Sequence, residues 1–381
     1  MPVCGGTGLE YEKFNLAKLR MVSYNDKIVR QRNSSIEIMR LLSMILIVVH
    51  HIVGQGLGFQ FYCLGGSYAQ ITNWFPIICI ESFCIVGVNL FILISGFYGI
   101  RLKSKSVIKF LTVVLGFVVL HTTAEYLYNP EFSIKAALRK VVFFYSENTA
   151  WFVKSYFLLM LSSFIINPAL KQLSKAQLMT VLAILVYINV YLGFVKHWDI
   201  NENGYTLSHM VMIYVIGHAL NTFDIAERIK KRTCIFGYIL LSLFLALTIA
   251  FFLDKTTGDM TFRLLGYNNP IIMLSSICLF CFFVKNEFVD MRINFFASGI
   301  FGIYLLHQYH PLWTKVMIPN IRLHYEMLSI STFLLYSFLL VFLIITIGIA
   351  VNLMINKLID SILNMQRIKE ICMWWDNKLG L

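Results

Sequence analysis

Charged side chains are scarce in this sequence of 381 residues, and their scarcity excludes an ordinary soluble protein. Asp, Glu, Lys and Arg make up 14 % of the residues, against about 25 % in a typical soluble domain. Hydrophobic residues make up 58 %, and the mean hydropathy is +0.71. A soluble fold needs a polar exterior, whereas a lipid bilayer removes that need. The composition therefore predicts an integral membrane protein.

The sequence also lacks a secretory leader, a soluble domain and a metal-binding or disulfide pattern. Residues 1–33 are polar, without the apolar core of a signal peptide, and we hypothesise that Met21 is the true start. The eight cysteines are scattered. Cys278 and Cys281 lie within an apolar run and have no second ligand pair, so they are interpreted as packing residues rather than a zinc site. The net charge of +12 fits basic cytoplasmic loops better than nucleic-acid binding.

The apolar stretches predict an all-α polytopic fold of about ten transmembrane helices, since one crossing takes about 20 apolar residues. The predicted spans are 37–56, 74–100, 107–128, 150–170, 176–195, 208–223, 235–253, 268–284, 294–313 and 328–356. Most of the 32 Lys and Arg residues fall on the side that holds the amino terminus, which places that terminus in the cytoplasm. The predicted parts are a polar cytoplasmic segment 1–33, a membrane domain 34–356 and a cytoplasmic tail 357–381.

The first predicted span carries ionisable side chains, which are costly in lipid and therefore indicate function. Arg40 and His51 are eleven positions apart, so they share a helix face to within about 20° and differ in depth by about 16 Å. Glu37 lies three positions before Arg40 and can pair with it, whereas His50 points about 100° away. Glu37 and Arg40 could also be simple interfacial anchors, and His51 could be a packed histidine. A neutral imidazole is also suited to deprotonate a hydroxyl group.

Basic and small residues at the end of the second span suggest a binding rim. Ser95 and Gly96 allow a close helix contact or a local break. Arg101, Lys103 and Lys105 follow on the cytoplasmic side. They are either a cluster that sets the topology or a site for the phosphates of a nucleotide-bearing donor.

Aromatic and histidine residues at two other span ends are candidate contacts for a substrate. Trp151 opens the fourth span, where an interfacial aromatic anchor is equally expected. Tyr304 and His307 share a face of the ninth span, towards the outer surface. Three histidines and Glu81 fall in the outer half, but their spacing fits no known metal motif, and no metal is expected.

Taken in order, these residues resemble the membrane-bound acyltransferase-3 family, whose members O-acylate surface sugars. The match covers residues 34–356. Its four motifs are Arg40 with His51, Asn89-Leu90-Phe91 through Ser95-Gly96-Phe97, Trp151-Phe152, and Ile303-Tyr304-Leu305-Leu306-His307.

The resemblance implies cytoplasmic acetyl-CoA as the donor and a carbohydrate hydroxyl on the far side as the acceptor. His51 would be the catalytic base or the acyl carrier, and Arg40 would be its partner along the helix or a contact for the CoA moiety. Glu37 would pair with Arg40 at the entry. Arg101, Lys103, Lys105 and Ser95 would contact the donor, and Tyr304, His307 and Trp151 the acceptor. The family often has two arginines after the second span, but here only Arg101 is one. This chain also has no extracellular hydrolase-like domain, so transfer would be direct or use a partner, such as a polysaccharide-assembly protein, at a bacterial inner membrane.

Two other classes of function remain open at this stage. A secondary transporter or flippase also has many spans with intramembrane charges, although no internal repeat is visible. A membrane scaffold without chemistry would leave the aligned Arg40 and His51 unexplained. Loss of acyl product with transport intact in a His51→Ala variant would separate these classes.

Overall fold

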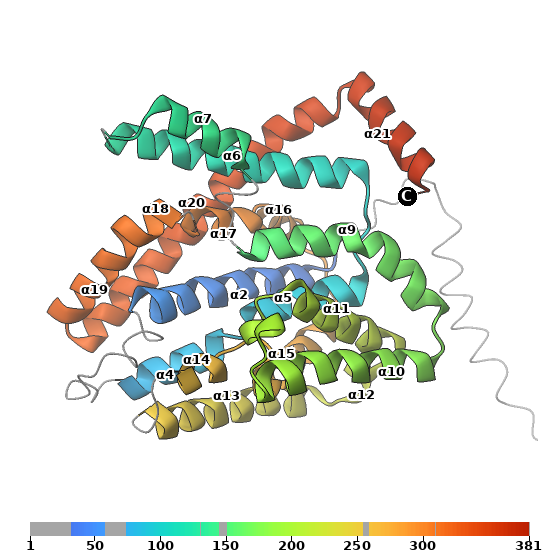
Figure 1. Cartoon of the computed structure of the whole chain (residues 1–381), viewed down its shortest axis with the longest axis vertical. Helices are drawn as coiled ribbons and strands as arrows, with labels where there is room; N and C mark the ends of the chain where they lie inside the picture. Colours follow the sequence, from blue (N-terminus) through green and yellow to red (C-terminus); the bar gives the residue numbers. More distant parts are fainter. Residues whose placement is uncertain are drawn as a thin grey trace, which may run out of the picture.

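The computed structural model describes residues 32–57, 74–129, 131–144, 151–253, 259–308 and 310–380, and every regular element in these ranges is helical (Figure 1). The all-α prediction is confirmed. Residues 1–31, which include Met21, lie outside the described ranges. The elements are α2 (Ser34–His50), η1 (His51–Gly56), α4 (Trp74–Cys84), α5 (Gly87–Tyr98), α6 (Ser104–Tyr128), α7 (Ile134–Val142), α9 (Trp151–Gln172), α10 (Lys175–Val186), η3 (Tyr187–Val195), η4 (Asp199–Gly204), α11 (Leu207–Thr222), α12 (Ile225–Arg228), α13 (Lys231–Leu253), α14 (Asp259–Leu264), α15 (Pro270–Val284), α16 (Met291–Ala297), α17 (Phe301–His307), α18 (His310–Leu312), η5 (Trp313–Met317), α19 (Ile318–Met327), α20 (Ile330–Leu363) and α21 (Gln366–Leu379).

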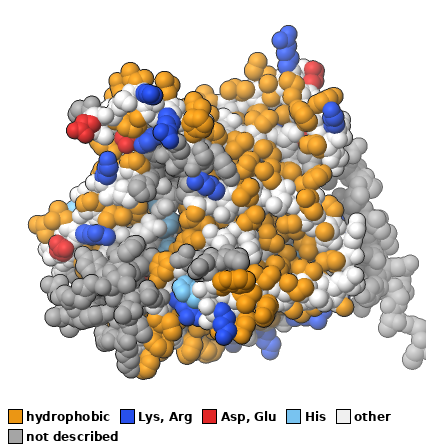
Figure 2. Space-filling view, viewed as in Figure 1, with side chains coloured by type: hydrophobic (Ala, Val, Ile, Leu, Met, Phe, Trp, Pro, Cys, Tyr) orange, Lys and Arg blue, Asp and Glu red, His pale blue; other side chains and the backbone are white. Residues whose placement is uncertain are grey.

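Seven helical stretches are long and apolar enough to cross a membrane, and they confirm the polytopic prediction. They are Ser34–Gly56, Phe75–Tyr98, Ser104–Tyr128, Trp151–Gln172, Lys175–Val195, Lys231–Phe252 and Ile330–Leu363. Their outer faces are apolar: on α13, for example, Phe236, Leu240 and Phe244 are all more than half exposed. In Figure 2 hydrophobic side chains cover most of the right-hand half of the face shown, and few Lys or Arg side chains lie among them. Such a surface is stable only against lipid.

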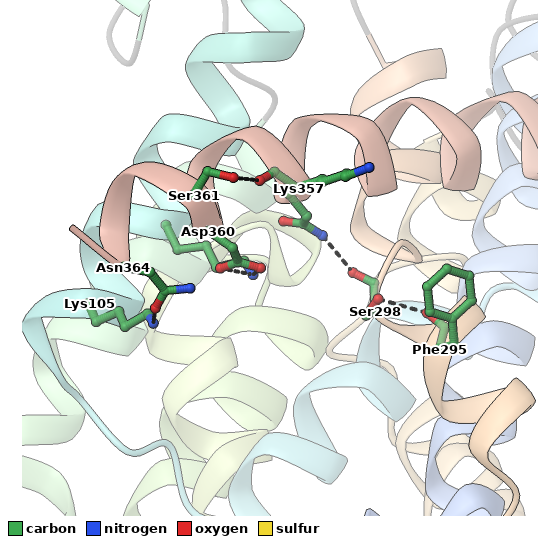
Figure 3. Close-up of polar contacts among 9 residues, drawn as sticks. Lys105, Phe295, Ser298, Lys357, Asp360, Ser361 and Asn364 are labelled. Atoms are coloured by element: carbon green, nitrogen blue, oxygen red, sulfur yellow. Dashed lines mark hydrogen bonds and ion pairs between the residues drawn. The ribbon is translucent and has the colours of Figure 1, made fainter.

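The other three predicted spans are helical but shorter or interrupted. Helices α11 and α15 have 16 and 15 residues, fewer than a full crossing needs. The prediction of one continuous helix over 294–313 is wrong, because the chain breaks after α16 and again after α17. The backbone carbonyl of Ser298, freed by the first break, accepts a hydrogen bond of 3.1 Å from the Asn356 side chain of α20. Figure 3 shows Ser298 facing α20 at this point. A side chain thus supplies the hydrogen bond that lipid cannot.

Helix α2 lies inside the bundle, in contact with α4, α5, α15, α16, α17 and α20. It therefore presents its side chains to other helices rather than to lipid. The second predicted span bends beside it, because the chain turns at Ile85 and Val86 between α4 and α5. Gly87 follows the bend, and a Cβ there would lie 2.8 Å from the carbonyl oxygen of Ser43 in α2. The bend and the glycine together let α5 approach α2 closely.

The closest helix contact joins α5 to α11 and accounts for the small residues at the end of the second span. A Cβ on Gly96 would lie 2.0 Å from the carbonyl oxygen of Tyr214, and one on Gly217 would lie 2.6 Å from that of Leu93. Only glycine fits at such a backbone approach. Of the two interpretations of Ser95-Gly96, the close contact is therefore the one that the structure supports.

Segments assigned to the cytoplasm lie together at one end of the bundle. Ser34 at the start of α2 donates its backbone N–H to the carbonyl of Phe288, at 2.8 Å. Ser104 at the start of α6 donates to Asp376 of α21, also at 2.8 Å. These contacts agree with the predicted alternation of the chain across the membrane, whereas the placement of this end in the cytoplasm rests on the charge pattern. The tail after residue 356 is helical, because α20 continues to Leu363 and α21 follows.

Candidate functional site

Two adjacent histidines stand where α2 changes its winding. The α-helix ends at His50, and the wider π-helical turn η1 begins at His51. Such turns insert an extra residue into a helix and are frequent at functional sites. His50 and His51 are 2 % and 4 % exposed, and they contact different neighbours. The change of winding thus places two imidazoles side by side inside the bundle.

His51 lies against His307, the last residue of the short helix α17. Nδ1 of His51 is 2.8 Å from Nε2 of His307, and Nδ1 of His307 is 2.7 Å from the carbonyl oxygen of Ile303. The carbonyl can only accept, so His307 donates from Nδ1, and in its neutral form it accepts at Nε2. His51 then donates from Nδ1 and keeps its lone pair on Nε2. This arrangement fixes the tautomer in which His51 can act as a base.

The side chains of Gln308 and Trp313 complete the surroundings of this pair. Nε2 of Gln308 lies 2.9 Å from Nδ1 of His51. Rotation of this amide by 180° exchanges its nitrogen and oxygen, and the oxygen then accepts from the Nδ1–H of His51. The Trp313 ring lies 6.3 Å from the ring of His51, and its Nε1 donates to Gln55 at 2.9 Å. Sequence reasoning did not single out Gln308 or Trp313, although Gln308 directly follows His307.

The position of α17 depends on a second close backbone contact. A Cβ on Gly302 would lie 2.3 Å from the carbonyl oxygen of Gly348 in α20. Because α17 has only seven residues, this contact fixes much of its placement. His307 is therefore presented to His51 by the packing of α17 on α20.

Aromatic side chains surround the histidine pair. The Tyr304 ring is buried and lies 6.3 Å from His51 and 5.8 Å from His307, so the structure brings together all three predicted residues. Trp151 is one layer further out. Its ring lies 5.6 Å from Tyr267, which in turn lies 6.3 Å from the ring of His50.

A buried contact between His50 and Glu81 beside this cluster was missed by the sequence analysis. Nδ1 of His50 is 2.6 Å from Oε1 of Glu81 in α4, and the Glu81 side chain is fully buried. Nε2 of His50 is 3.5 Å from the hydroxyl of Tyr267. The sequence did signal Glu81 as the one acidic residue of its span. However, His50 lies about 100° around the helix from the face that Arg40 and His51 share, so the sequence analysis did not consider it as a partner for Glu81.

The remaining predicted residues lie towards the opposite, basic end. Arg40 pairs with Glu37 at 2.5 Å, and this Arg side chain is 32 % exposed, so the two form a pair with each other rather than with His51. At the start of α6, Lys105 reaches Asn364, the residue directly after α20, at 3.3 Å (Figure 3). Ser95 lies 3.1 Å from the hydroxyl of Tyr156.

All three predicted basic residues of this segment have exposed side chains, and two of them differ from Lys105 in their contacts. Arg101 and Lys103 stand beside the start of α6, and the ion pairs found in the described part of the chain do not include them. Both therefore remain candidates for contact with an anionic ligand.

The described residues contain no group of three or more His, Cys, Asp or Glu side chains arranged to hold a metal ion. A family model described as an acyltransferase domain matches residues 33–353, which include every residue of the cluster above. Comparisons with curated proteins and with solved structures give no match.

Proposed function

The chain belongs to the acyltransferase-3 family, and from that premise we propose that it moves an acyl group from cytoplasmic acyl-CoA to a carbohydrate hydroxyl at the outer face. The observation that carries this proposal is the contact of 2.8 Å between His51 and His307. It joins the two histidines of separate family motifs and leaves Nε2 of His51 as a basic nitrogen. A base fixed in one tautomer is what hydroxyl deprotonation requires.

The reaction needs one base and two substrates held together. Nε2 of His51 takes the proton from the acceptor hydroxyl, and the oxygen attacks the thioester carbonyl carbon. The carbon–sulfur bond then breaks, the ester product forms and CoA leaves through its sulfur, which takes up a proton. General-base catalysis of this kind contributes roughly 10²- to 10⁴-fold, and fixing both reactants in contact contributes further.

The donor is proposed to enter from the basic end. Arg101 and Lys103 offer two exposed cations for its phosphates, and Lys105 adds a third that is already hydrogen-bonded to Asn364. The pantetheine arm would lie along α2, passing the Arg40–Glu37 pair. Eleven residues of helix correspond to about 16 Å between Arg40 and His51. The phosphates can thus stay in the aqueous phase while the thioester reaches the base.

The acceptor is proposed to bind among the aromatic rings at the other end of α2. Tyr304 and His307 contact the base directly, and Trp151 lies behind Tyr267. A sugar has apolar faces that pack on such rings and hydroxyl groups that need hydrogen-bond partners, and the cluster offers both. A polysaccharide or a lipid-linked unit at a bacterial inner membrane fits this placement, as do polysaccharide-assembly proteins as partners.

The test is NMR analysis of ester-linked acyl groups on surface polysaccharide from cells that carry wild type, His51→Ala or no copy. His324→Ala is the matched control, since His324 lies in α19 and stacks on Tyr336 at 4.2 Å, outside the cluster. We expect ester signals with wild type and His324→Ala only, at equal protein levels in the membrane. Membrane vesicles given labelled acyl-CoA provide the second arm. Identical spectra in all cells together with no label transfer in vesicles would overturn the proposal.

A further inference from the structure

The surroundings of His50 and His51 differ in charge, although the two residues are adjacent. His51 contacts two neutral groups, the imidazole of His307 and the amide of Gln308. His50 contacts a carboxylate, that of Glu81, at 2.6 Å. The two rings lie 5.2 Å apart, centroid to centroid. Two imidazoles therefore lie side by side, one against neutral groups and the other against a carboxyl group.

The imidazole of His50 is placed to balance the negative charge of the Glu81 carboxylate. The carboxylate is fully buried, its Oε1 bonds His50, and its Oε2 has no hydrogen-bond partner among the described residues. A buried carboxylate without a partner of opposite charge is destabilising, and the imidazole of His50 is the group within hydrogen-bond distance that can carry that charge. The ion pairs of the described residues give it no Lys or Arg. Charge balance thus favours His50 as an imidazolium, with protons on both ring nitrogens.

The local packing keeps room for this pair. Gly54 lies one turn further along, and a Cβ there would stand 3.2 Å from Oε1 of Glu81 and 3.4 Å from Cε1 of His50. A larger residue would press on the carboxylate and on the ring together. On the other side, the Tyr267 hydroxyl is 3.5 Å from Nε2 of His50, too far for a strong hydrogen bond. The Nε2 proton is therefore held loosely enough to be given away.

We propose that His50 is the catalytic acid of the acyl transfer and that Glu81 is the positioning residue that keeps it protonated. This inference rests on the proposed function. His51 takes the proton of the acceptor hydroxyl, the new carbon–oxygen bond forms, and the carbon–sulfur bond breaks. The departing sulfur takes the Nε2 proton of His50 and leaves as a neutral thiol. The proton gained by His51 then returns to His50, so both histidines start the next cycle unchanged.

Protonation of the sulfur matters here because the site is buried. A free thiolate loses most of its hydration in such surroundings, and neutralising it removes that cost. Environments that drive two neighbouring titratable groups apart indicate the acid and the base. A different account of the pair is that it only fastens α4 to α2. The two accounts predict different behaviour when the whole pair is replaced by apolar residues.

The first experiment replaces the pair. In purified protein we expect His50→Leu with Glu81→Leu to keep or raise the melting temperature, since apolar replacement of a buried ion pair is often neutral or stabilising. Transfer from acyl-CoA should nevertheless fall by at least 100-fold. His209→Gln is the control, because His209 is equally buried but bonds Asn89, at 2.8 Å. Near wild-type transfer by the double variant would overturn the proposal.

The second experiment changes the leaving group. An aryl thioester with the same acyl chain releases a much weaker base, so its departure needs no acid. We expect His50→Gln and Glu81→Gln to lose at least 100-fold with acyl-CoA but to stay within about tenfold of wild type with the aryl thioester, whereas His51→Gln loses activity with both. Equal losses with both donors in the His50 variant would exclude His50 as the acid. No transfer by wild type from acyl-CoA would instead count against the proposed function.

Discussion

Replacing His307 tests the claim that it fixes the tautomer of His51. In His307→Leu, the Nδ1–H of His51 loses its acceptor at 2.8 Å in a site where His51 is 4 % exposed. An unsatisfied buried donor costs about 1–3 kcal/mol, which corresponds to a loss of roughly 5- to 150-fold in kcat. The amide of Gln308, whose Nε2 lies 2.9 Å from the same nitrogen, can accept this N–H through its oxygen after a 180° rotation, so the low end of that range is expected. Removing both side chains should reach the high end.

The matched control is His307→Gln, whose amide oxygen can occupy the place of the imidazole Nε2. We expect it to retain activity within a few-fold of wild type, while His307→Asn, which is too short, behaves like His307→Leu. The assay is initial-rate transfer from labelled acyl-CoA in membrane vesicles, with protein levels matched. KM for acyl-CoA should not change, because the donor phosphates bind at the other end of α2. If Gln, Asn and Leu variants had equal rates, the hydrogen bond from His51 to His307 would play no part in catalysis, and the tautomer argument would fail.

Three further outcomes follow from the packing and the charges. Gly302→Leu should lower the melting temperature of purified protein and abolish transfer, because its side chain would overlap the backbone of α20; a folded and active variant would show that α17 can move. Arg101→Ala with Lys103→Ala should raise KM for acyl-CoA several-fold with little change in kcat, and the difference should shrink at high salt; a loss of kcat alone would argue against phosphate binding. Asn356→Leu should destabilise the protein by about 1–3 kcal/mol in chemical denaturation, since the Ser298 carbonyl loses its donor, and an unchanged unfolding midpoint would contradict that.

The membrane class and most of the spans could be predicted because lipid imposes a simple rule. A run of about 20 apolar residues is most stable in the hydrocarbon core of a bilayer, so the stretches that form α6, α13 and α20 could be identified from the sequence. The break between α16 and α17 was not visible, because hydropathy does not record where a backbone carbonyl will find a donor. That donor, Asn356, is 58 residues away in the chain. A hydropathy pattern describes neighbouring residues and cannot identify a hydrogen-bond donor so far along the chain.

The candidate site was predictable only as separate pieces. Helical periodicity gave the shared face of Arg40 and His51 and that of Tyr304 and His307, and the family motifs contain the same four residues. Periodicity describes direction along one helix and cannot say which other helix stands opposite. His50 was therefore set aside as pointing away, although it faces the buried Glu81 of α4. The expected phosphate-binding rim is in part engaged within the protein, since Lys105 bonds Asn364.

The unbroken run of α2 from Ser34 to His50 has a consequence for the permeability of the membrane. This helix contacts α4, α5, α15, α16, α17 and α20, so under the proposed function the donor arm enters between packed helices rather than through an open pore. Under the proposed function, an acyl group crosses about half of the bilayer as part of a bound donor, while neither the sugar nor the CoA changes sides. The acyl group would thus reach the outer side of the membrane without an open pore. Proteoliposomes that hold this protein should keep a proton gradient as long as empty liposomes do, even during turnover.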